Sequence, residues 1–141
     1  MASEIERKFL VDAALWANAR PAAGVRIEQA YLNSHKERVV RVRIAGDSAF
    51  LTIKGLTTGA TRTEFEYAIP VADARAMIDE LCEEPVLSKT RYQLPLGAHV
   101  WEVDEFHGAN AGLTVAEIEL GDESESFERP AWIAEEVTDD P

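Results

Sequence analysis

Glu4-Ile5-Glu6-Arg7-Lys8-Phe9, near the start of the chain, places a charged residue at every second position. Successive side chains of a β-strand point to opposite faces, so Glu4, Glu6 and Lys8 share one face of this strand. Taken alone, such a segment is typical of any amphipathic strand. Its meaning depends on whether other strands carry the same pattern.

Seven further segments show a period of two and are expected to form strands. With residues 3–10, the expected strands are 24–33, 38–45, 48–54, 61–69, 86–94, 99–106 and 113–121. Residues 11–19 and 71–83 show helical periodicity instead and are expected to pack outside the sheet. One more helical turn is expected in the tail that begins at Glu128. No internal repeat or linker divides the chain, so the sequence predicts a single domain over residues 1–141.

Seven of the eight strands carry a charged face. The carboxylates on these faces are Glu4, Glu6, Glu64, Glu66, Asp104, Glu117 and Glu119, and the bases are Lys8, Arg41, Arg43, Lys54, Lys89 and Arg91. Arg62 and Glu102 share these faces. On a single strand, a charged face is more often the solvent side of an antiparallel sheet whose other side packs the core. Here, however, like charges repeat at positions i and i+2, where they repel each other. Multivalent cations and polyanions bound between them would stabilise this arrangement.

A sheet that closes on itself would account for both the charged and the apolar faces of the strands, with the charged faces inside. The sequence therefore predicts a mainly β (α+β) fold, an eight-stranded antiparallel closed barrel or tunnel with a charged lumen and helices packed outside. Buried charges are costly unless they are paired or bound to metal. The lumen is thus expected to be a wet ion site, and the apolar strand faces are expected to point outward.

The inward-facing groups suit a metal–polyphosphate site. Carboxylates without His or Cys companions favour Mg²⁺ or Mn²⁺, and Mg²⁺ commonly bridges carboxylates and substrate phosphates. Arg and Lys bind phosphoryl oxygens. Phosphoryl transfer requires mainly alignment and charge neutralisation, which six bases and seven carboxylates can supply.

Water is the expected nucleophile, because no Cys or Ser lies in a nucleophile context. Two metal ions could divide the work of polarising the phosphoryl group and activating water. Alternatively, Lys8 and Tyr31 could orient or deprotonate the water. On residue patterns alone, Tyr31 could equally be a tyrosine that fills space in the barrel. The sequence contains no Walker loop, which excludes a P-loop mechanism.

Composition narrows the partners and the location. The net charge of −12 disfavours a general nucleic-acid surface. No apolar run approaches the length of a membrane span, so we expect a cytoplasmic protein without a membrane partner. Outward apolar faces, such as the one carrying Val40, Val42 and Ile44, could support a homodimer.

In the order of its motifs, the chain resembles the CYTH superfamily, also called triphosphate tunnel metalloenzymes. The resemblance covers about Glu4 to Thr138. It starts with a Glu-x-Glu-x-Lys signature at Glu4, Glu6 and Lys8. The later motifs are Arg41-Val42-Arg43, Thr52-Ile53-Lys54, Glu64-Phe65-Glu66-Tyr67, Lys89-Thr90-Arg91-Tyr92, Trp101-Glu102-Val103-Asp104-Glu105-Phe106 and Ala116-Glu117-Ile118-Glu119-Leu120.

This resemblance implies an antiparallel tunnel with the bases on the triphosphate and the carboxylates on divalent metal. It also implies that Lys8 and Tyr31 match positions proposed to activate water. Similar members continue beyond Glu136-Val137-Thr138 into a C-terminal helix that helps to close one tunnel mouth. Because this chain stops at Pro141, we expect a tunnel domain without that helix.

The compact domain looks most like bacterial tripolyphosphatases, which split tripolyphosphate into diphosphate and phosphate. Thiamine triphosphatase, nucleoside triphosphatase and class IV adenylyl cyclase activities are the enzymatic alternatives within the superfamily, because the fold does not fix the substrate. A polyphosphate-binding module without turnover is a further alternative. The carboxylates argue against it, because binding an anion alone gains nothing from them.

Overall fold

The computed structural model describes residues 3–138 of the chain. The strands are β1 (Ser3–Val11), β2 (Val25–Asn33), β3 (Arg38–Ala45), β4 (Ser48–Gly55), β5 (Thr61–Ile69), β6 (Glu83–Leu96), β7 (His99–Phe106), β8 (Thr114–Glu119) and β9 (Ile133–Glu136). The helices are α1 (Ala13–Ala19), α2 (Val71–Glu80) and the 3₁₀ turn η1 (Gly108–Asn110). The eight predicted strands and both predicted helices are present. Strand β6 is longer than predicted at both ends.

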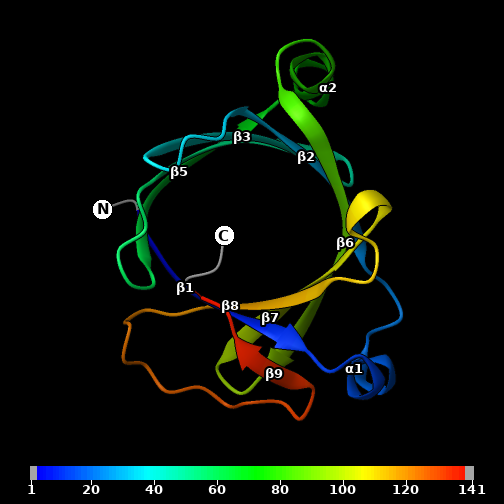
Figure 1. The fold of residues 1–141 in the computed structure, drawn as a ribbon, viewed down its shortest axis with the longest axis vertical. Helices are drawn as coiled ribbons and strands as arrows, with labels where there is room; N and C mark the ends of the chain where they lie inside the picture. The colour runs from blue at the N-terminus through cyan, green and yellow to red at the C-terminus, as the bar shows by residue number, and fades with distance from the viewer. Residues whose placement is uncertain (1–2, 139–141) are drawn as a thin grey trace.

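The strands form one closed antiparallel sheet. Their order is β5-β4-β3-β2-β6-β7-β8-β1, and β1 pairs again with β5. The closing contact is short, with Ser3, Glu4 and Ile5 opposite Thr63, Arg62 and Thr61. Figure 1 shows the resulting ring viewed along its opening, with both helices outside it. The predicted eight-stranded barrel is therefore confirmed.

Two apolar cores lie on the outside of the barrel wall. One lies under α2, where Ala74 and Ile78 pack against Val42 and Ala49 of the sheet. A larger core forms on the opposite part of the wall. Its buried members are Phe9, Trp16, Trp101, Val103, Ala116, Ile118, Leu120 and Trp132. The apolar side chains of the strands thus face outward, as their alternation with charged residues predicts.

Helix α1 covers the larger core through a single tryptophan. The helix begins after Asp12, whose carboxylate accepts a hydrogen bond from the Leu15 amide at 3.0 Å. Its buried Trp16 packs edge-to-face against Trp132 and donates a 2.8 Å hydrogen bond from Nε1 to Glu105. A capped amphipathic turn therefore suffices to hold the helix on the barrel. No helix among residues 3–138 combines the length and apolar character needed to cross a membrane.

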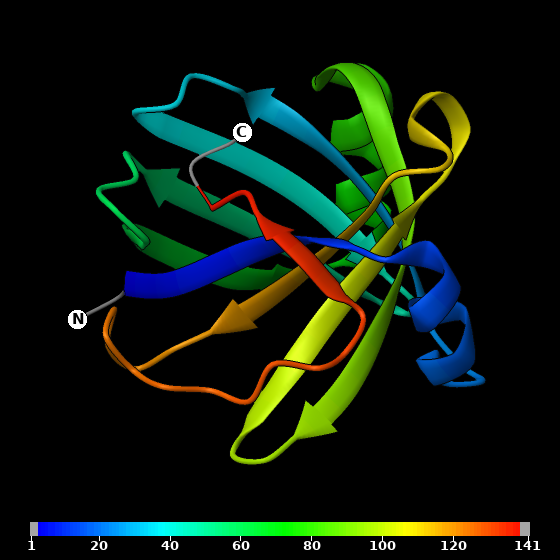
Figure 2. The same ribbon diagram turned by 60° about the horizontal axis from the view of Figure 1, so that its bottom comes forward.

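The tail after Glu128 contains a strand, so the predicted helical turn is wrong. Strand β9 pairs with the second half of β1, placing Phe9 opposite Glu136 and Val11 opposite Ile133 (Figure 2). β5 covers only the first residues of β1, so the rest of that strand edge has backbone groups that need partners. The Val137 amide donates to the Lys8 carbonyl at 2.8 Å. Pairing with a distant strand thus overrides local preference.

The segment between β8 and β9 crosses the outside of the barrel and contacts two hairpins. Glu123 accepts hydrogen bonds from the Ala60 amide at 3.1 Å and the Thr61 hydroxyl at 2.9 Å, at the turn before β5. Glu125 pairs with His99 at the start of β7. Phe127 packs edge-to-face on Trp101. The segment therefore covers the larger core and joins hairpins that are separate in sequence.

Acid should weaken the attachment of β9. Arg7 donates two hydrogen bonds to Glu136, and the bond through its Nε is 2.8 Å long. These bonds, more than any other interaction, lower the pKa of Glu136 to about 2. A carboxyl with a lowered pKa stabilises the fold above its unfolded pKa near 4.5, and this contribution is lost as the pH falls toward 2.

We therefore expect Glu136→Gln to reduce the free energy of unfolding by about 1 kcal/mol or less at pH 7. The difference from the wild type should shrink between pH 4.5 and pH 3. Urea unfolding across this pH range measures it. Glu135→Gln, which changes the exposed neighbour on the same strand, is the control. A difference that stays constant down to pH 3 would contradict the assignment.

Candidate active site

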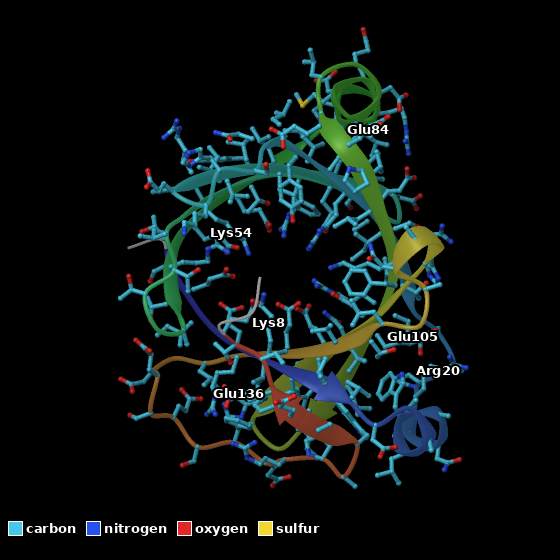
Figure 3. All side chains as sticks on the ribbon, in the orientation of Figure 1. Lys8, Arg20, Lys54, Glu84, Glu105 and Glu136 are labelled. Atoms are coloured by element: carbon cyan, nitrogen blue, oxygen red, sulfur yellow. The ribbon has the colours of Figure 1, made fainter. Side chains whose placement is uncertain are left out.

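The charged strand faces line the inside of the barrel. Figure 3 shows Lys8 and Lys54 directed toward the central space, whereas Arg20 and Glu105 lie outside the wall. Opposite residues of neighbouring strands share a face, and the registers place Lys8 opposite Glu117 and Lys54 opposite Glu64. Groups far apart in the sequence therefore share one lumen.

Asp104 binds two cations on the inner wall. Its carboxylate accepts two hydrogen bonds from Arg91, at 2.8 and 2.9 Å, and lies 2.7 Å from Nζ of Lys89. Burial lowers the pKa of Lys89, and the charge of Asp104 opposes this shift. Although burial acts against it, hydrogen bonding from Arg91 and the charge of Lys89 lower the pKa of Asp104. In this structure Asp104 is thus an ion-pair partner, and a metal role for it stays a prediction.

Lys54 lies between two carboxylates from different strands. Its Nζ is 2.8 Å from Glu4 on β1 and 3.3 Å from Glu64 on β5. Burial, followed by the charge of Glu4, raises the pKa of Glu64. This group bridges the strand pair that closes the barrel, so it contributes to closure as well as to the lumen.

Arg41 has an incomplete set of partners. Its nearest carboxylate, Glu66, is 3.8 Å away, and its contact to the Thr52 hydroxyl is 3.5 Å. The Thr52 hydroxyl donates instead to Glu66 at 2.8 Å. Among residues 3–138, the buried Nε of Arg41 has no hydrogen-bond partner. A buried donor without a partner in a charged lumen fits an anionic ligand that supplies the missing acceptor.

Arg43 is held by a neutral side chain. Oε1 of Gln29 accepts hydrogen bonds from Nε at 2.9 Å and from a terminal nitrogen at 2.7 Å. Burial, followed by the charges of Arg41 and Arg91, lowers the pKa of Arg43 to about 10. The two hydrogen bonds orient this guanidinium without neutralising it.

Carboxyl groups crowd together on the side of the lumen formed by β1, β7 and β8. Burial and the neighbouring Glu117 raise the pKa of Glu6. Burial acts to raise the pKa of Glu117, but the hydrogen bond with Glu6 together with the charges of Arg91 and Lys89 lowers it. Burial and the charge of Glu4 raise the pKa of Glu119. The two neighbouring carboxyl groups thus shift each other's pKa in opposite directions.

A cavity of about 420 Å³ opens beside these carboxyl groups. It is lined by Glu6, Gln93, Ala98, His99, Val100, Glu102, Glu117 and Glu119. Arg91 reaches the same place, at 3.4 Å from Glu102 and 3.5 Å from Glu117. The acidic cavity and the basic part of the wall are therefore directly adjacent.

The donor set of this cavity fits a hard divalent cation. No group of three or more His, Cys, Asp or Glu side chains within residues 3–138 is arranged to hold a metal ion without further ligands. Mg²⁺ does not require such a cage, because it usually keeps several waters and binds one or two carboxylates together with substrate phosphates. A cation beside Glu6 and Glu117 would relieve the repulsion between these neighbouring carboxyl groups.

Lys8 and Tyr31 come from opposite walls. Lys8 lies on β1, and Tyr31 lies on β2, opposite Arg41 of β3. Strands β1 and β2 are four strands apart in either direction around the ring. Within residues 3–138, the side chains of Lys8 and Tyr31 make no hydrogen bond to each other. Acting on one water would therefore require both side chains to reach it across the lumen.

Two inward-facing polar residues, Gln29 and Gln93, were not predicted from the sequence. Gln29 is buried, and Gln93 lines the acidic cavity. The search for charged strand faces passed over them because they carry no charge. Gln29 and Tyr31 are two residues apart on β2, so their side chains point to the same face of the strand. This alternation could have placed Gln29 in the lumen.

The fold and the charged inner wall define a β-tunnel of the triphosphate tunnel type, in which bases and carboxylates share one closed barrel. The CYTH domain matches residues 2–140, and the chain belongs to this family. Family membership implies metal dependence, as the enzymes of this fold are triphosphate tunnel metalloenzymes.

Two inorganic triphosphatases are similar over nearly the whole chain. One, from Acetivibrio thermocellus, is 47% identical over 141 residues, covering 100% of this chain and 89% of the relative. Another, from Nitrosomonas europaea, is 36% identical over 143 residues, covering 98% of this chain and 91% of the relative.

Solved structures show the same architecture. The crystal structure of an inorganic triphosphatase aligns with a TM-score of 0.63 at 31% identity, covering 97% of this chain and 90% of that protein. A protein from Bacillus halodurans aligns with a TM-score of 0.69 at 14% identity, over 87% of this chain and 84% of its own, and supports the fold alone.

Removing the charge of Asp104 should destabilise the protein more than removing a charge at its surface. Asp104→Asn leaves Lys89 and Arg91 buried without their shared counter-charge, so the free energy of unfolding should fall by about 3–5 kcal/mol. Urea denaturation at neutral pH measures this loss. Glu102→Gln, on the same face of β7 but with its side chain 34% exposed, should cost about 1 kcal/mol or less. Equal losses for the two variants would contradict the assigned role.

Proposed function

We propose that this chain hydrolyses inorganic tripolyphosphate to diphosphate and phosphate inside the tunnel, in a reaction that depends on a divalent metal ion. The observation that carries the proposal is the division of one lumen into a basic part around Arg41, Arg43 and Arg91 and an acidic cavity around Glu6 and Glu117. The similarity to inorganic triphosphatases over the whole chain supports the choice of substrate.

The triphosphate would lie along the basic wall. Arg41, Arg43, Lys54, Lys89, Arg91 and Lys8 are the proposed binding residues. Within the described residues 3–138, Arg41 offers a buried nitrogen without a partner and Arg43 a guanidinium without a carboxylate, so these two gain most from an anion. Lys54, Lys89 and Arg91 pair with carboxylates within the wall. Substrate oxygens would share or replace those carboxylates.

The metal would be Mg²⁺ or Mn²⁺, and we propose two ions for each tunnel. Glu6, Glu117 and Glu119 face the acidic cavity and are the first candidates to hold them. Glu4, Glu64, Glu66 and Asp104 now pair with cations and would become free as those cations turn to the substrate. When bound, the metal supplies charge neutralisation at the phosphoryl group.

Water is the proposed nucleophile, attacking the phosphorus in line with the leaving diphosphate. Lys8 lies opposite Glu117, next to the acidic cavity. From this position its ammonium can orient the water, while Tyr31 faces it from the opposite wall. The bases neutralise the charge that develops on the leaving oxygen.

Other parts of the expected biology remain predictions from sequence. These are the cytoplasmic location, the single domain over residues 1–141, the homodimer, and the absence of nucleic-acid and membrane partners. Thiamine triphosphate and nucleoside triphosphates, hydrolysed or cyclised, are the alternative substrates, because the fold does not fix the substrate. A module that binds polyphosphate without turnover would leave the crowded carboxyl groups unexplained.

Metal dependence tests the catalytic proposal. Phosphate release from tripolyphosphate should require added Mg²⁺ or Mn²⁺ and should stop in EDTA. Glu117→Gln should lower kcat/KM by about 100-fold or more because it removes a carboxylate from the acidic cavity, and Lys54→Ala should lower it as well. Glu80→Gln, an exposed change on α2 outside the barrel, is the control. Undiminished turnover in EDTA would rule the proposal out, and tight binding without phosphate release would favour the binding module.

A comparison of substrates tests the choice of tripolyphosphate. The inner wall offers cations for phosphoryl groups, whereas we identify no built site for a base or a thiazole ring within residues 3–138. We expect kcat/KM for tripolyphosphate to exceed the values for ATP and thiamine triphosphate by about 10-fold or more, which corresponds to about 1.4 kcal/mol. Parallel assays of phosphate release at equal concentrations measure the ratios. A higher value for either organic triphosphate would replace the proposed substrate.

A further inference from the structure

Gln29 occupies a central place in the basic part of the lumen. It lies on β2, 4% exposed, directly opposite Arg43 on β3. One atom, Oε1, accepts both hydrogen bonds from the guanidinium, at 2.9 and 2.7 Å. Two hydrogen bonds to a single oxygen fix the plane of the guanidinium and the direction in which its remaining donors point.

The partner of Arg43 differs in charge from the partners of other cations in the lumen. Asp104 neutralises both Lys89 and Arg91, and Glu4 lies 2.8 Å from Lys54. Among residues 3–138, Arg43 makes no ion pair. A carboxylate in place of Gln29 would offer the same hydrogen bonds, so the amide differs mainly in leaving the positive charge uncancelled.

The hydrogen bonds to Gln29 leave donors for a ligand. A guanidinium has five N–H donors. Gln29 takes one from Nε and one from a terminal nitrogen, so three remain. Planar, forked donors of this kind match the oxygens of a phosphoryl group. Arg43 thus combines a fixed orientation, free donors and an uncancelled charge.

We propose that Gln29 is a positioning residue for substrate binding. It holds the guanidinium of Arg43 in one orientation through a neutral oxygen, so that the full charge of Arg43 acts on the phosphoryl oxygens. The inference rests on the proposed triphosphate substrate but assigns a role to a residue that does not itself touch the reacting atoms. Its identity as an amide, and not merely its size, is what the role requires.

Two substitutions separate charge from packing. Glu at position 29 keeps the acceptor and adds a charge that cancels Arg43, whereas Met keeps the approximate length and removes the acceptor. We expect Gln29→Glu to retain or raise the thermal unfolding midpoint, because a buried ion pair replaces a neutral contact. The same variant should bind tripolyphosphate about 10- to 100-fold more weakly, since a charge-assisted contact is lost.

Gln29→Met should show the opposite balance. Its unfolding midpoint should fall, because a buried guanidinium loses its acceptor, while its affinity for tripolyphosphate should fall less than that of Gln29→Glu. Its kcat should fall more than its KM rises, because the cation remains but is no longer held in place. A purely structural role for Gln29 predicts that Gln29→Met is more harmful than Gln29→Glu in stability, in binding and in turnover alike.

The experiment uses the full chain and inorganic tripolyphosphate as the probe. Calorimetry in EDTA measures binding without turnover, and phosphate release with Mg²⁺ gives kcat and KM for the wild type and both variants. Glu28→Gln, a change of charge on the outer face of the same strand, is the matched control and should leave both readouts unchanged. Circular dichroism melting curves establish that each variant is folded.

The outcomes distinguish this inference from the proposed function. Wild-type affinity in Gln29→Glu, or weaker binding by Gln29→Met than by Gln29→Glu, would overturn the role of Gln29 even if the wild type hydrolyses tripolyphosphate. A wild type that binds tripolyphosphate without hydrolysing it, with Gln29→Glu binding more weakly, would instead overturn hydrolysis and support the positioning role.

Discussion

Asp104 is 1% exposed and serves two buried cations at once, with Lys89 at 2.7 Å and Arg91 in a two-bond contact. Charges removed from water must find partners within the protein, and this requirement shapes the whole barrel. The inner wall is occupied by groups that pair with one another, so it cannot serve as an apolar core. The apolar halves of the same strands face outward, where α2 covers one part of the wall and α1 with the β8–β9 segment covers another. Stability and chemistry thus occupy opposite faces of one sheet.

The alternation of residues predicted the closed tunnel because it encodes which face of each strand is charged. Phe9 and Trp101 are fully buried outside the wall, whereas Lys8 and Asp104 line the lumen, as parity requires. The tail was mispredicted for a physical reason. Strand β9 forms on the part of the β1 edge that β5 leaves without partners, and a local sequence pattern carries no information about a distant strand edge.

The composition of the site was easier to predict than its internal pairing. The pattern placed Lys54 in the lumen, but the contact with Glu4 depends on the short β1–β5 closure, which sequence periodicity does not show. Gln29 was missed because a search for charged residues ignores neutral ones, although its neutrality is what distinguishes the environment of Arg43. The alternation of residues predicts which side chains face the lumen. It does not predict which charged groups pair there, because those pairs form between different strands.

The position of β1 has a consequence for how the chain acquires its fold during synthesis. Strand β1 pairs with β5, β8 and β9, and its bond from Arg7 to Glu136 spans 129 residues. Such distant pairing has a large entropic cost of loop closure and slows folding. Glu4 can meet Lys54 and β5 early in synthesis, whereas the second half of β1 must wait for β8 and β9. Ring closure is then a late, cooperative event, and chains interrupted before β9 would carry an open strand edge that invites association.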